Sequence, residues 1–514
     1  MSRLLFTAIT VLTLVAAVPA LAQKSKDTVR IPINEPISGL SDYLNANPES
    51  EFNSEAVHDT LIRFDEEQNK YVPLLAKSWR RVDDRTLEVD LRDDVTWHDG
   101  EKFDSEDVKH TFEWAANPEA KVRSPFYYDW IQKVETLGPY KLRVVSHRPT
   151  PYDEAQLAVN LFVMPEHLYS RLPIGDKLAF TRKPVGTGMY RAVEVNDAKG
   201  IFLAKNDAYK HGGTTKPAGN IRYLNQPYVP DVGAQVAEFL AGNLDILRQV
   251  NTDQLKELAK MPNVKAVLVQ GPNIAYMYID ARGRAGVKAL TDPRVRQAIF
   301  MAVDRDQIMK LVVGDFKLNR VPDGMCWKDQ MACDFSLQPP VHDPAGAKKL
   351  LAEAGYPNGF DVEIVTFASS IADYAVAISG QLSKIGIRST VQKFAVATQR
   401  KVEAEGKIAI FVGAYPSGSL PDAASTISYF YDRPPSGDFH GDTELHEMAR
   451  RMDGVMDQGQ RKEMARQIFD RATEQAYIGI VGPRVNGLTY RDHLDVKVSR
   501  YSNVGFWPWD VNAR

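Results

Sequence analysis

The chain alternates between segments in which apolar residues recur at every second position and segments in which they recur at every third or fourth position. The first spacing predicts half-buried strands, and the second predicts amphipathic helices. No internal repeat or low-complexity segment interrupts this alternation. We therefore expect an α/β protein.

Three helices are clearly indicated. Two of them begin with an Asp-Pro pair, at Asp292 and Asp343. Aspartate is a good N-cap and proline suits the first helical position. Gly355 fits the C-terminal cap of the second helix. A third apolar stripe at helical spacing comprises Met464, Ile468, Phe469, Ala472 and Ala476.

The first 22 residues form a separate apolar segment. Arg3 precedes an uncharged run from Leu4 to Val18, and Ala20-Leu21-Ala22 has the small residues of a cleavage site. This pattern predicts a secretory signal peptide, residues 1–22, cut after Ala22. A membrane anchor is the alternative, but a spanning helix needs roughly 20 apolar residues. No cysteine follows the run, so we expect a soluble, exported protein without a lipid anchor.

Length and charge limit the remaining possibilities. The 514 residues are 44% hydrophobic, which is enough for large cores. The length favours roughly two to four domains. The formal charge is −3, and loss of Arg3 with the signal peptide makes it one unit more negative. Such a balance gives no indication of nucleic-acid binding.

The chain has two cysteines, Cys326 and Cys333. In an oxidising compartment they are expected to form a disulfide. A loop of this length would be stabilised by about 2.5 kcal/mol on the chain-entropy argument. A zinc site is the weaker alternative, because no histidine lies near the two thiols in the sequence.

The stretch VTWHDGEKFDSEDVKHTFEW, residues 95–114, gathers acids and histidines as an acid–base site would. Each acid also has a structural task available. Asp99-Gly100 suits a tight turn, and Asp104 can cap a helix with Asp107 as its capping-box partner. A strand, a turn and a capped helix explain the stretch without catalysis. The alternative is a secreted hydrolase or lyase that uses His98 and Asp99.

The rest of the sequence offers no catalytic motif. Gly186-Thr187-Gly188 lacks the third glycine of a phosphate-binding loop, and no G-x-S-x-G motif is present. The histidines are scattered, and His440 and His446 are too far apart for one face of a helix. We therefore expect no enzyme, no metal and no cofactor.

Seven segments, in the same order, resemble the extracellular solute-binding proteins of family 5, which serve dipeptide-, oligopeptide- and nickel-type ABC importers. In KPVGTGMYRA, Met189 stands where the family usually has proline. The segments are YVPLLAKSW (71–79), TLEVDLRDDVTWHDGEKFDSEDV (86–108), KPVGTGMYRA (183–192), AKNDAYKHGG (204–213), FLAGNLDIL (239–247), TDPRVRQAIFMAVDRDQI (291–308) and DPAGAKKLLAEAGYPNGF (343–360).

The resemblance implies a two-lobed periplasmic-binding-protein fold of the large peptide-binding class, in which the lobes close over a ligand. It places residues 23–273 and the tail 485–514 in lobe I, and residues 274–484 in lobe II. The chain should cross between lobes near Asn273–Tyr276 and Ile480–Val485.

The resemblance also implies binding without turnover. A monomer would capture a small solute and deliver it to the permease and ATPase subunits of an ABC importer. Ligand contacts to both lobes would favour the closed state. A sensory role for the same cleft is the alternative.

The ligand class depends on one segment, FVGAYPSGSLPDAAS, residues 411–425. Peptide-binding members hold the ligand's amino group with the aspartate of a W-x-x-D-Y pattern. Here Phe411 replaces the tryptophan, Tyr415 keeps the tyrosine, and Ala414 stands at the aspartate position. Asp422 is the candidate substitute. Small peptides remain the first expectation, and opines, oligosaccharides and other non-peptide solutes are the alternatives.

Further candidate contacts follow from position along the resemblance. Glu35 and Asp42, in the loop 34–47, are candidates for pairing with a cationic ligand, and surface exposure is the alternative. Nickel is less expected, because the histidines form no obvious constellation. Trp507 and Trp509 are interpreted as lobe packing. The remaining candidates are Tyr276 at the predicted hinge and the polar residues Ser417 and Ser419.

Overall fold

The computed structural model describes residues 27–37, 39–40, 43, 48–122, 125–174, 181–318, 321–322, 324–367, 371–416 and 420–514. The predicted signal peptide, residues 1–22, lies outside the described residues. So do three of the candidate site residues, Asp42, Ser417 and Ser419.

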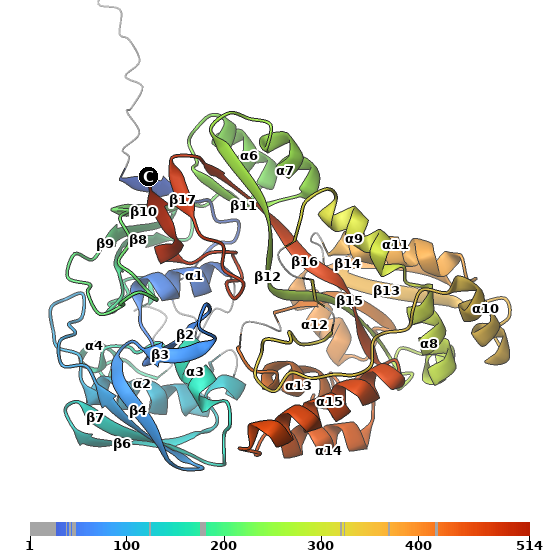
Figure 1. The fold of residues 1–514 in the computed structure, drawn as a ribbon, viewed down its shortest axis with the longest axis horizontal. Coiled ribbons are helices and arrows are strands. Elements are labelled where there is room, and N and C mark those ends of the chain that lie inside the picture. The colour runs from blue at the N-terminus through green and yellow to red at the C-terminus, as the bar shows by residue number, and fades with distance from the viewer. Residues whose placement is uncertain are drawn as a thin grey trace, which may run out of the picture.

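Two bodies lie side by side and share one sheet (Figure 1). The sheet has six strands in the order β11-β16-β12-β15-β13-β14. Its longest strands are β12 (Val264–Ile279) and β16 (Ile478–Arg491), which pair antiparallel and run from one body into the other. Their register is irregular between Gln270 and Ile274, next to the crossing predicted from the sequence.

The hydrophobic cores divide in the same way. Three core clusters contain residues up to Val269 and from Leu488 onward, and two further clusters contain residues from Ile274 to Val481. We call the first body lobe I and the second lobe II. The two-lobed α/β fold predicted from the sequence is therefore confirmed, while the exact lobe boundaries stay a prediction.

Lobe I contains two four-stranded sheets, β1-β10-β9-β8 and β4-β5-β7-β6, and the hairpins β2-β3 and β17-β18. Its elements are β1 (Thr28–Arg30), α1 (Pro48–Val57), β2 (Ile62–Asp65), β3 (Lys70–Pro73), β4 (Ala76–Asp83), β5 (Thr86–Leu91), α2 (Ser105–Ala116), η1 (Pro118–Ala120), η2 (Pro125–Tyr127), β6 (Ile131–Gly138), β7 (Lys141–Ser146), α3 (Asp153–Val159), α4 (Glu166–Tyr169), β8 (Tyr190–Asn196), β9 (Gly200–Lys205), β10 (Tyr223–Pro227), α6 (Val232–Leu240), β11 (Ile246–Val250), α7 (Thr252–Leu258), β17 (Leu494–Val496), η4 (Pro508–Asp510) and β18 (Val511–Ala513).

Lobe II packs helices around its half of the six-stranded sheet (Figure 1). The predicted Asp-Pro helix starts are confirmed, because Asp292 and Asp343 each cap a helix with proline in the first turn. Its elements are η3 (Lys288–Thr291), α8 (Pro293–Ala302), α9 (Arg305–Val313), α10 (Pro344–Glu353), β13 (Asp361–Phe367), α11 (Ala372–Ser383), β14 (Arg388–Phe394), α12 (Val396–Ala404), β15 (Ile410–Tyr415), α13 (Ala424–Tyr431), α14 (Thr443–Met452) and α15 (Gln458–Glu474).

The acid-rich stretch 95–114 forms the predicted turn and capped helix. The Asp104 side chain accepts from the Glu106 backbone N–H at the start of α2. Asp107 returns the contact by accepting from the Asp104 backbone N–H at 2.9 Å, which completes the capping box. The acids therefore stabilise a helix N-terminus, as the sequence predicted.

The His98 side chain holds the Gly186–Gly188 segment in place through two hydrogen bonds. Its Nδ1 accepts from the Gly186 N–H at 3.1 Å, and its Nε2 donates to the Gly188 carbonyl at 2.9 Å. The segment approaches α1 so closely that a Cβ on Gly186 would lie 1.8 Å from the Val57 carbonyl oxygen. Burial lowers the pKa of His98 to about 4. The ring is thus neutral with both nitrogens occupied, which does not suit a general base.

Candidate functional site

The described part of the segment 411–425, predicted to carry ligand contacts, reaches the place where the two lobes meet. The segment begins in strand β15 and ends in the first turn of helix α13. Leu420 and Ala424 form a small buried cluster with Tyr152 and Ala155 of lobe I. This side of lobe II therefore packs against lobe I in the structure.

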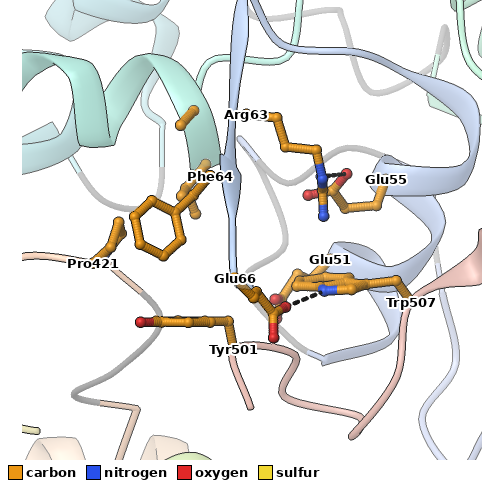
Figure 2. A pocket seen from close by; sticks show the side chains of 10 residues that line it. Glu51, Glu55, Arg63, Phe64, Glu66, Pro421, Tyr501 and Trp507 are labelled. Atoms are coloured by element: carbon orange, nitrogen blue, oxygen red, sulfur yellow. Dashed lines mark hydrogen bonds and ion pairs between the residues drawn. The ribbon is translucent and has the colours of Figure 1, made fainter. Parts of the chain in front are cut away.

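A small pocket lies beside this contact (Figure 2). Lobe I supplies nine of its lining residues from α1, β2, α3 and the C-terminal segment, and lobe II supplies Pro421. The cavity encloses about 30 Å³. The residues that line it are Glu51, Glu55, Arg63, Phe64, Glu66, Ala158, Val159, Pro421, Tyr501 and Trp507.

Three carboxylates and one guanidinium line this pocket, so its charge is negative. Arg63 is engaged by Glu55 at 3.0 Å. Glu66 accepts from uncharged donors, the Ser499 hydroxyl at 2.5 Å and the Trp507 indole N–H at 2.9 Å. Hydrogen bonds from neutral groups orient a carboxylate but do not neutralise its charge. The pocket is therefore suited to a cationic group.

A network of buried charged side chains lies next to the pocket and contacts its lining residue Glu55. The Lys216 side chain has no exposed surface and contacts Asp59 at 2.7 Å and Glu55 at 3.5 Å. Asp59 also accepts from Thr187 and His211, each at 2.8 Å. Burial opposes ionisation of Asp59, but Lys216 and His211 outweigh it and hold its pKa well below its ordinary value. The network fixes Glu55, and through it Arg63, at the pocket wall.

The two C-terminal tryptophans complete this wall by packing. Their rings stack with centroids 5.5 Å apart, and the Arg63 guanidinium lies 4.0 Å from the centroid of the Trp509 ring. Both tryptophans are less than one-tenth exposed. These contacts agree with the interpretation of Trp507 and Trp509 as lobe packing, with Trp507 also reaching the pocket.

The pocket continues into a larger groove on lobe I. The groove has a volume of about 530 Å³. It shares Arg63, Phe64, Glu66 and Trp507 with the pocket, so the two spaces adjoin. Its other lining residues come from the β2–β3 turn, the loop 214–217 and the segment 495–512, and most are polar.

Two of the sequence candidates are core residues of lobe II. Tyr276 is 3% exposed, and its ring centroid lies 4.9 Å from that of Phe430. Phe411 is 1% exposed and contacts Tyr276 and Tyr278. The interpretation of these two side chains as ligand contacts is not supported by their burial.

Three further candidates are more accessible. Ala414 and Tyr415 are partly exposed at the end of β15, and the Tyr415 hydroxyl donates to the Ser425 carbonyl at 3.0 Å. Glu35 is exposed on lobe I. Neither Ala414 nor Tyr415 provides an anionic group, so the aspartate that the family resemblance led us to expect has no counterpart at this position.

Asp422, the expected substitute, is committed to an internal ion pair. Its two carboxylate oxygens each lie 2.7 Å from a nitrogen of Arg461, and neither side chain has exposed surface. One of these oxygens also accepts from the Ala424 backbone N–H. The hypothesis that Asp422 binds a ligand ammonium is not supported, because its charge is already neutralised inside lobe II.

Sequence reasoning missed the acids that do line the pocket. Glu51 and Glu55 lie four residues apart on α1, which places them on one helix face. Glu66 follows directly after β2. The spacing of the two glutamates was visible in the sequence, but their burial against a distant C-terminal segment was not.

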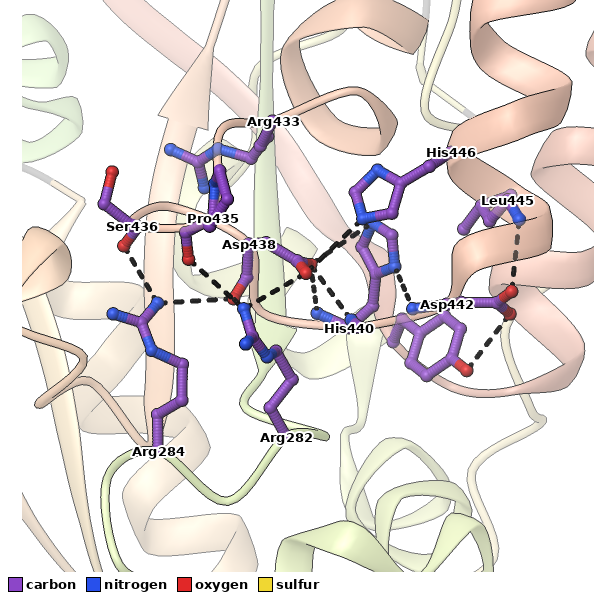
Figure 3. Close-up of polar contacts among 12 residues, drawn as sticks. Arg282, Arg284, Arg433, Pro435, Ser436, Asp438, His440, Asp442, Leu445 and His446 are labelled. Atoms are coloured by element: carbon purple, nitrogen blue, oxygen red, sulfur yellow. Dashed lines mark hydrogen bonds and ion pairs between the residues drawn. The ribbon is translucent and has the colours of Figure 1, made fainter.

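The structure brings together two histidines that their spacing in the sequence seemed to separate. His440 precedes α14 and His446 lies within it, yet their ring centroids are 4.6 Å apart (Figure 3). With Asp438 they offer three possible metal ligands within 4.8 Å of one another. The expectation of no histidine constellation was wrong, because it considered only helical spacing and not the capping turn before α14.

The donor set of this cluster does not suit a metal. His440 Nδ1 accepts from the Asp442 backbone N–H at 3.0 Å, so the proton of the neutral ring is on Nε2, the nitrogen that faces the cluster. A metal-bound histidine instead donates through its second nitrogen. Arg282 also contacts the Asp438 carboxylate at 3.2 Å, which opposes a second cation (Figure 3).

We predict that His440 makes folding stability depend on pH. Burial lowers the pKa of His440 to about 4, against an ordinary value near 6.5. Between these values the unfolded chain binds more protons, so stability must fall as pH falls from about 6.5 toward 4. The contribution is up to about 1.4 kcal/mol per pH unit. Urea unfolding of His440→Asn should show a weaker pH dependence than wild type.

The exposed His493 provides the control for this test. His493→Asn should keep the wild-type dependence. If His440→Asn and wild type lose stability equally between pH 6.5 and pH 4.5, the assignment of a neutral His440 is wrong.

We also predict that Asp422 supports the fold. Asp422→Asn leaves Arg461 buried without its carboxylate and should lower the free energy of unfolding by about 3–5 kcal/mol. Replacing both partners, in Asp422→Leu with Arg461→Met, should cost less than the single change, because no buried charge remains. Equal stability of Asp422→Asn and wild type in chemical denaturation would contradict this role.

The sequence model of the bacterial extracellular solute-binding proteins, family 5 (middle region), matches residues 70–438. The glutathione-binding protein GsiB of Pectobacterium atrosepticum is 28% identical over 393 residues, covering 74% of this chain and 72% of the relative. The fold is similar to NikA from Brucella suis in complex with Fe(III)-EDTA, with a TM-score of 0.82 and 19% identity, covering 95% and 100% of the two chains.

A second structure with this fold is the periplasmic binding protein DppA from Helicobacter pylori in complex with the peptide STSA, with a TM-score of 0.74. It is 19% identical, and the match covers 95% of this chain and 98% of that one. Because the family match spans well over half of the sequence, the chain belongs to the bacterial extracellular solute-binding proteins of family 5, the substrate-binding proteins of ABC importers.

Proposed function

We propose that this protein captures a peptide-like solute with a free amino group and holds that group in the acid-lined pocket between the lobes. Family membership makes the chain a binding protein and not an enzyme, which argues against the hydrolase alternative. The observation that supports the proposal is the placement of Glu51 and Glu66 beside Pro421, the residue that lobe II contributes.

The size of the pocket agrees with an amino group. A cavity needs roughly 10–15 Å³ to hold one water molecule, and an ammonium group is of similar size. A cavity of about 30 Å³ therefore has room for an ammonium but not for a whole peptide. The adjoining groove of about 530 Å³ offers space for the rest of the solute.

The class of solute is supported by the relatives. GsiB is named a glutathione-binding protein, and the DppA structure contains a tetrapeptide. Both ligands are peptides. In this chain we propose that the acid partner of the amine lies on lobe I, because lobe II presents Ala414 at the strand end and its nearby acid, Asp422, is paired with Arg461.

Capture would couple binding to lobe closure. Lobe I alone lines the groove, so a solute can bind there before the lobes close. Contact with Pro421 is made only when lobe II approaches. The closed state is favoured by this differential contact. We propose a division at residues 273 and 484, and the passage of β12 and β16 from one body into the other supports it.

The family is extracellular, and among the described residues no helix is long and apolar enough to cross a membrane. We propose export through a signal peptide cut after Ala22, a periplasmic location without a lipid anchor, and delivery of the solute by a monomer to a dedicated permease.

A thermal-shift panel tests the solute class. It should contain glutathione, di- and tripeptides, opines, oligosaccharides, betaines and nickel chelates. A ligand at 100 times its Kd stabilises by about 2.7 kcal/mol, which raises Tm measurably. We expect peptides with a free amino group to raise Tm and their N-acetylated forms to raise it less. Stabilisation by oligosaccharides alone would contradict the proposal.

The role of Glu66 is tested by Glu66→Gln, which keeps the shape and removes the charge. A hydrogen bond to a charged group contributes about 1.5–3 kcal/mol, so calorimetric titration should show at least about tenfold weaker peptide binding. The loss should vanish for the N-acetylated peptide. Glu135→Gln, at an exposed lobe I carboxylate paired with Lys133, is the matched control and should bind as wild type does. Unchanged affinity in Glu66→Gln would remove this residue from the site.

A further inference from the structure

The loop closed by the Cys326–Cys333 disulfide lies at the junction of the two lobes. The predicted disulfide is present, with the Cα atoms 5.9 Å apart. Most of the loop is buried in the core of lobe II, although it is far in sequence from the pocket-forming segments. Its backbone and side chains contact three separate parts of the molecule.

The first contact is with the lobe II side of the pocket. The Gln330 side chain donates to the Leu420 carbonyl at 2.7 Å, and the Met331 N–H donates to the Pro421 carbonyl at 3.1 Å. The Ala423 N–H returns a hydrogen bond to the Met331 carbonyl at 2.9 Å. The disulfide loop therefore fixes both sides of Pro421, the residue that closes the pocket from lobe II.

The second contact is with the crossing between the lobes. The Trp327 indole N–H donates to the Pro272 carbonyl at 3.0 Å. Pro272 lies within the irregular part of β12, between Gln270 and Ile274. The loop is thereby tied to the place where a hinge motion would change the backbone.

The third contact reaches lobe I itself. Asp329 forms an ion pair with Arg500 at 2.9 Å, and both side chains are about 30% exposed. Arg500 also donates from its side chain to the Glu66 carbonyl at 2.7 Å and from its backbone to the Glu66 carboxylate at 3.3 Å. The ion pair therefore connects the disulfide loop to the pocket acid on the opposite lobe.

We propose that the Cys326–Cys333 loop is a clasp that holds the lobes closed, with Asp329 and Arg500 as its positioning pair. The disulfide limits the loop's freedom, so Asp329 is presented toward lobe I without a large ordering cost. When the lobes separate, Pro421 leaves the pocket and the Asp329–Arg500 pair breaks. Closure of the lobes thus positions Pro421 and Glu66, on opposite sides of the pocket, at the same time.

The clasp rests on the proposed function only in its expected effect on solute affinity. Opening and closing of the lobes can be measured without any solute. An experiment can therefore contradict the clasp without contradicting the amine-binding pocket, and it can contradict the pocket without contradicting the clasp.

The test is small-angle X-ray scattering of the solute-free protein. Partly exposed ion pairs change equilibria by about two- to fivefold, so Asp329→Asn and Arg500→Gln should each shift the closed-to-open ratio toward open by that factor. The radius of gyration should rise. The double variant should add little to either single variant, because both remove the same contact.

Asp361→Asn is the matched control. Asp361 pairs with Arg388 at 2.6 Å within lobe II, and both side chains are exposed. This variant should scatter as wild type does. The melting temperatures of Asp329→Asn, Arg500→Gln and Asp361→Asn should stay close to wild type, which separates a clasp from a merely structural contact.

A second variant tests the disulfide. Cys326→Ser with Cys333→Ser should shift the lobes toward open in the same direction. If Asp329→Asn, Arg500→Gln and the serine pair all keep the wild-type radius of gyration, the clasp does not exist. If they open the lobes while titration with glutathione gives the wild-type Kd, the loop does not position the pocket.

Discussion

The antiparallel pairing of β12 with β16 is the constraint on which the two-lobed architecture depends. Both strands pass from lobe I into lobe II, and they remain paired on each side of the irregularity at Gln270–Ile274. Two adjacent strands restrict how the lobes can move, because one cannot shift far without the other. The residues that meet between the lobes are therefore fixed by strands that line neither the pocket nor the groove.

The buried ion pairs of lobe I explain how its pocket-lining side chains are held in position. Lys216 and Asp59 have no exposed side-chain surface, and such charges are tolerated only when paired. Their network reaches Glu55 and Arg63, while neutral donors orient Glu66. Lobe II follows the opposite arrangement, because Asp422, the acid next to its pocket residue Pro421, is neutralised by Arg461. The difference supports the proposal that lobe I binds the cationic group.

Local patterns predicted local structure well. The acids of residues 95–114 cap α2, and the Asp-Pro pairs at 292 and 343 start helices. The fold class followed from seven ordered segments, and the cysteine pair was expected from the compartment. The site was harder to predict, because α1 and β2 near the N-terminus line it together with residues 501–507, which follow more than 400 residues later in the sequence. Helical spacing likewise could not foresee the contact of His440 with His446, which a capping turn creates.

A crystal structure of the protein with a bound peptide from the panel would test the central claim most directly. The account predicts the peptide ammonium about 3 Å from a carboxylate oxygen of Glu66 or Glu51, with Pro421 covering it and the remaining residues in the lobe I groove. A peptide whose amino group lies against Ala414, with the acid-lined pocket holding only water, would contradict it.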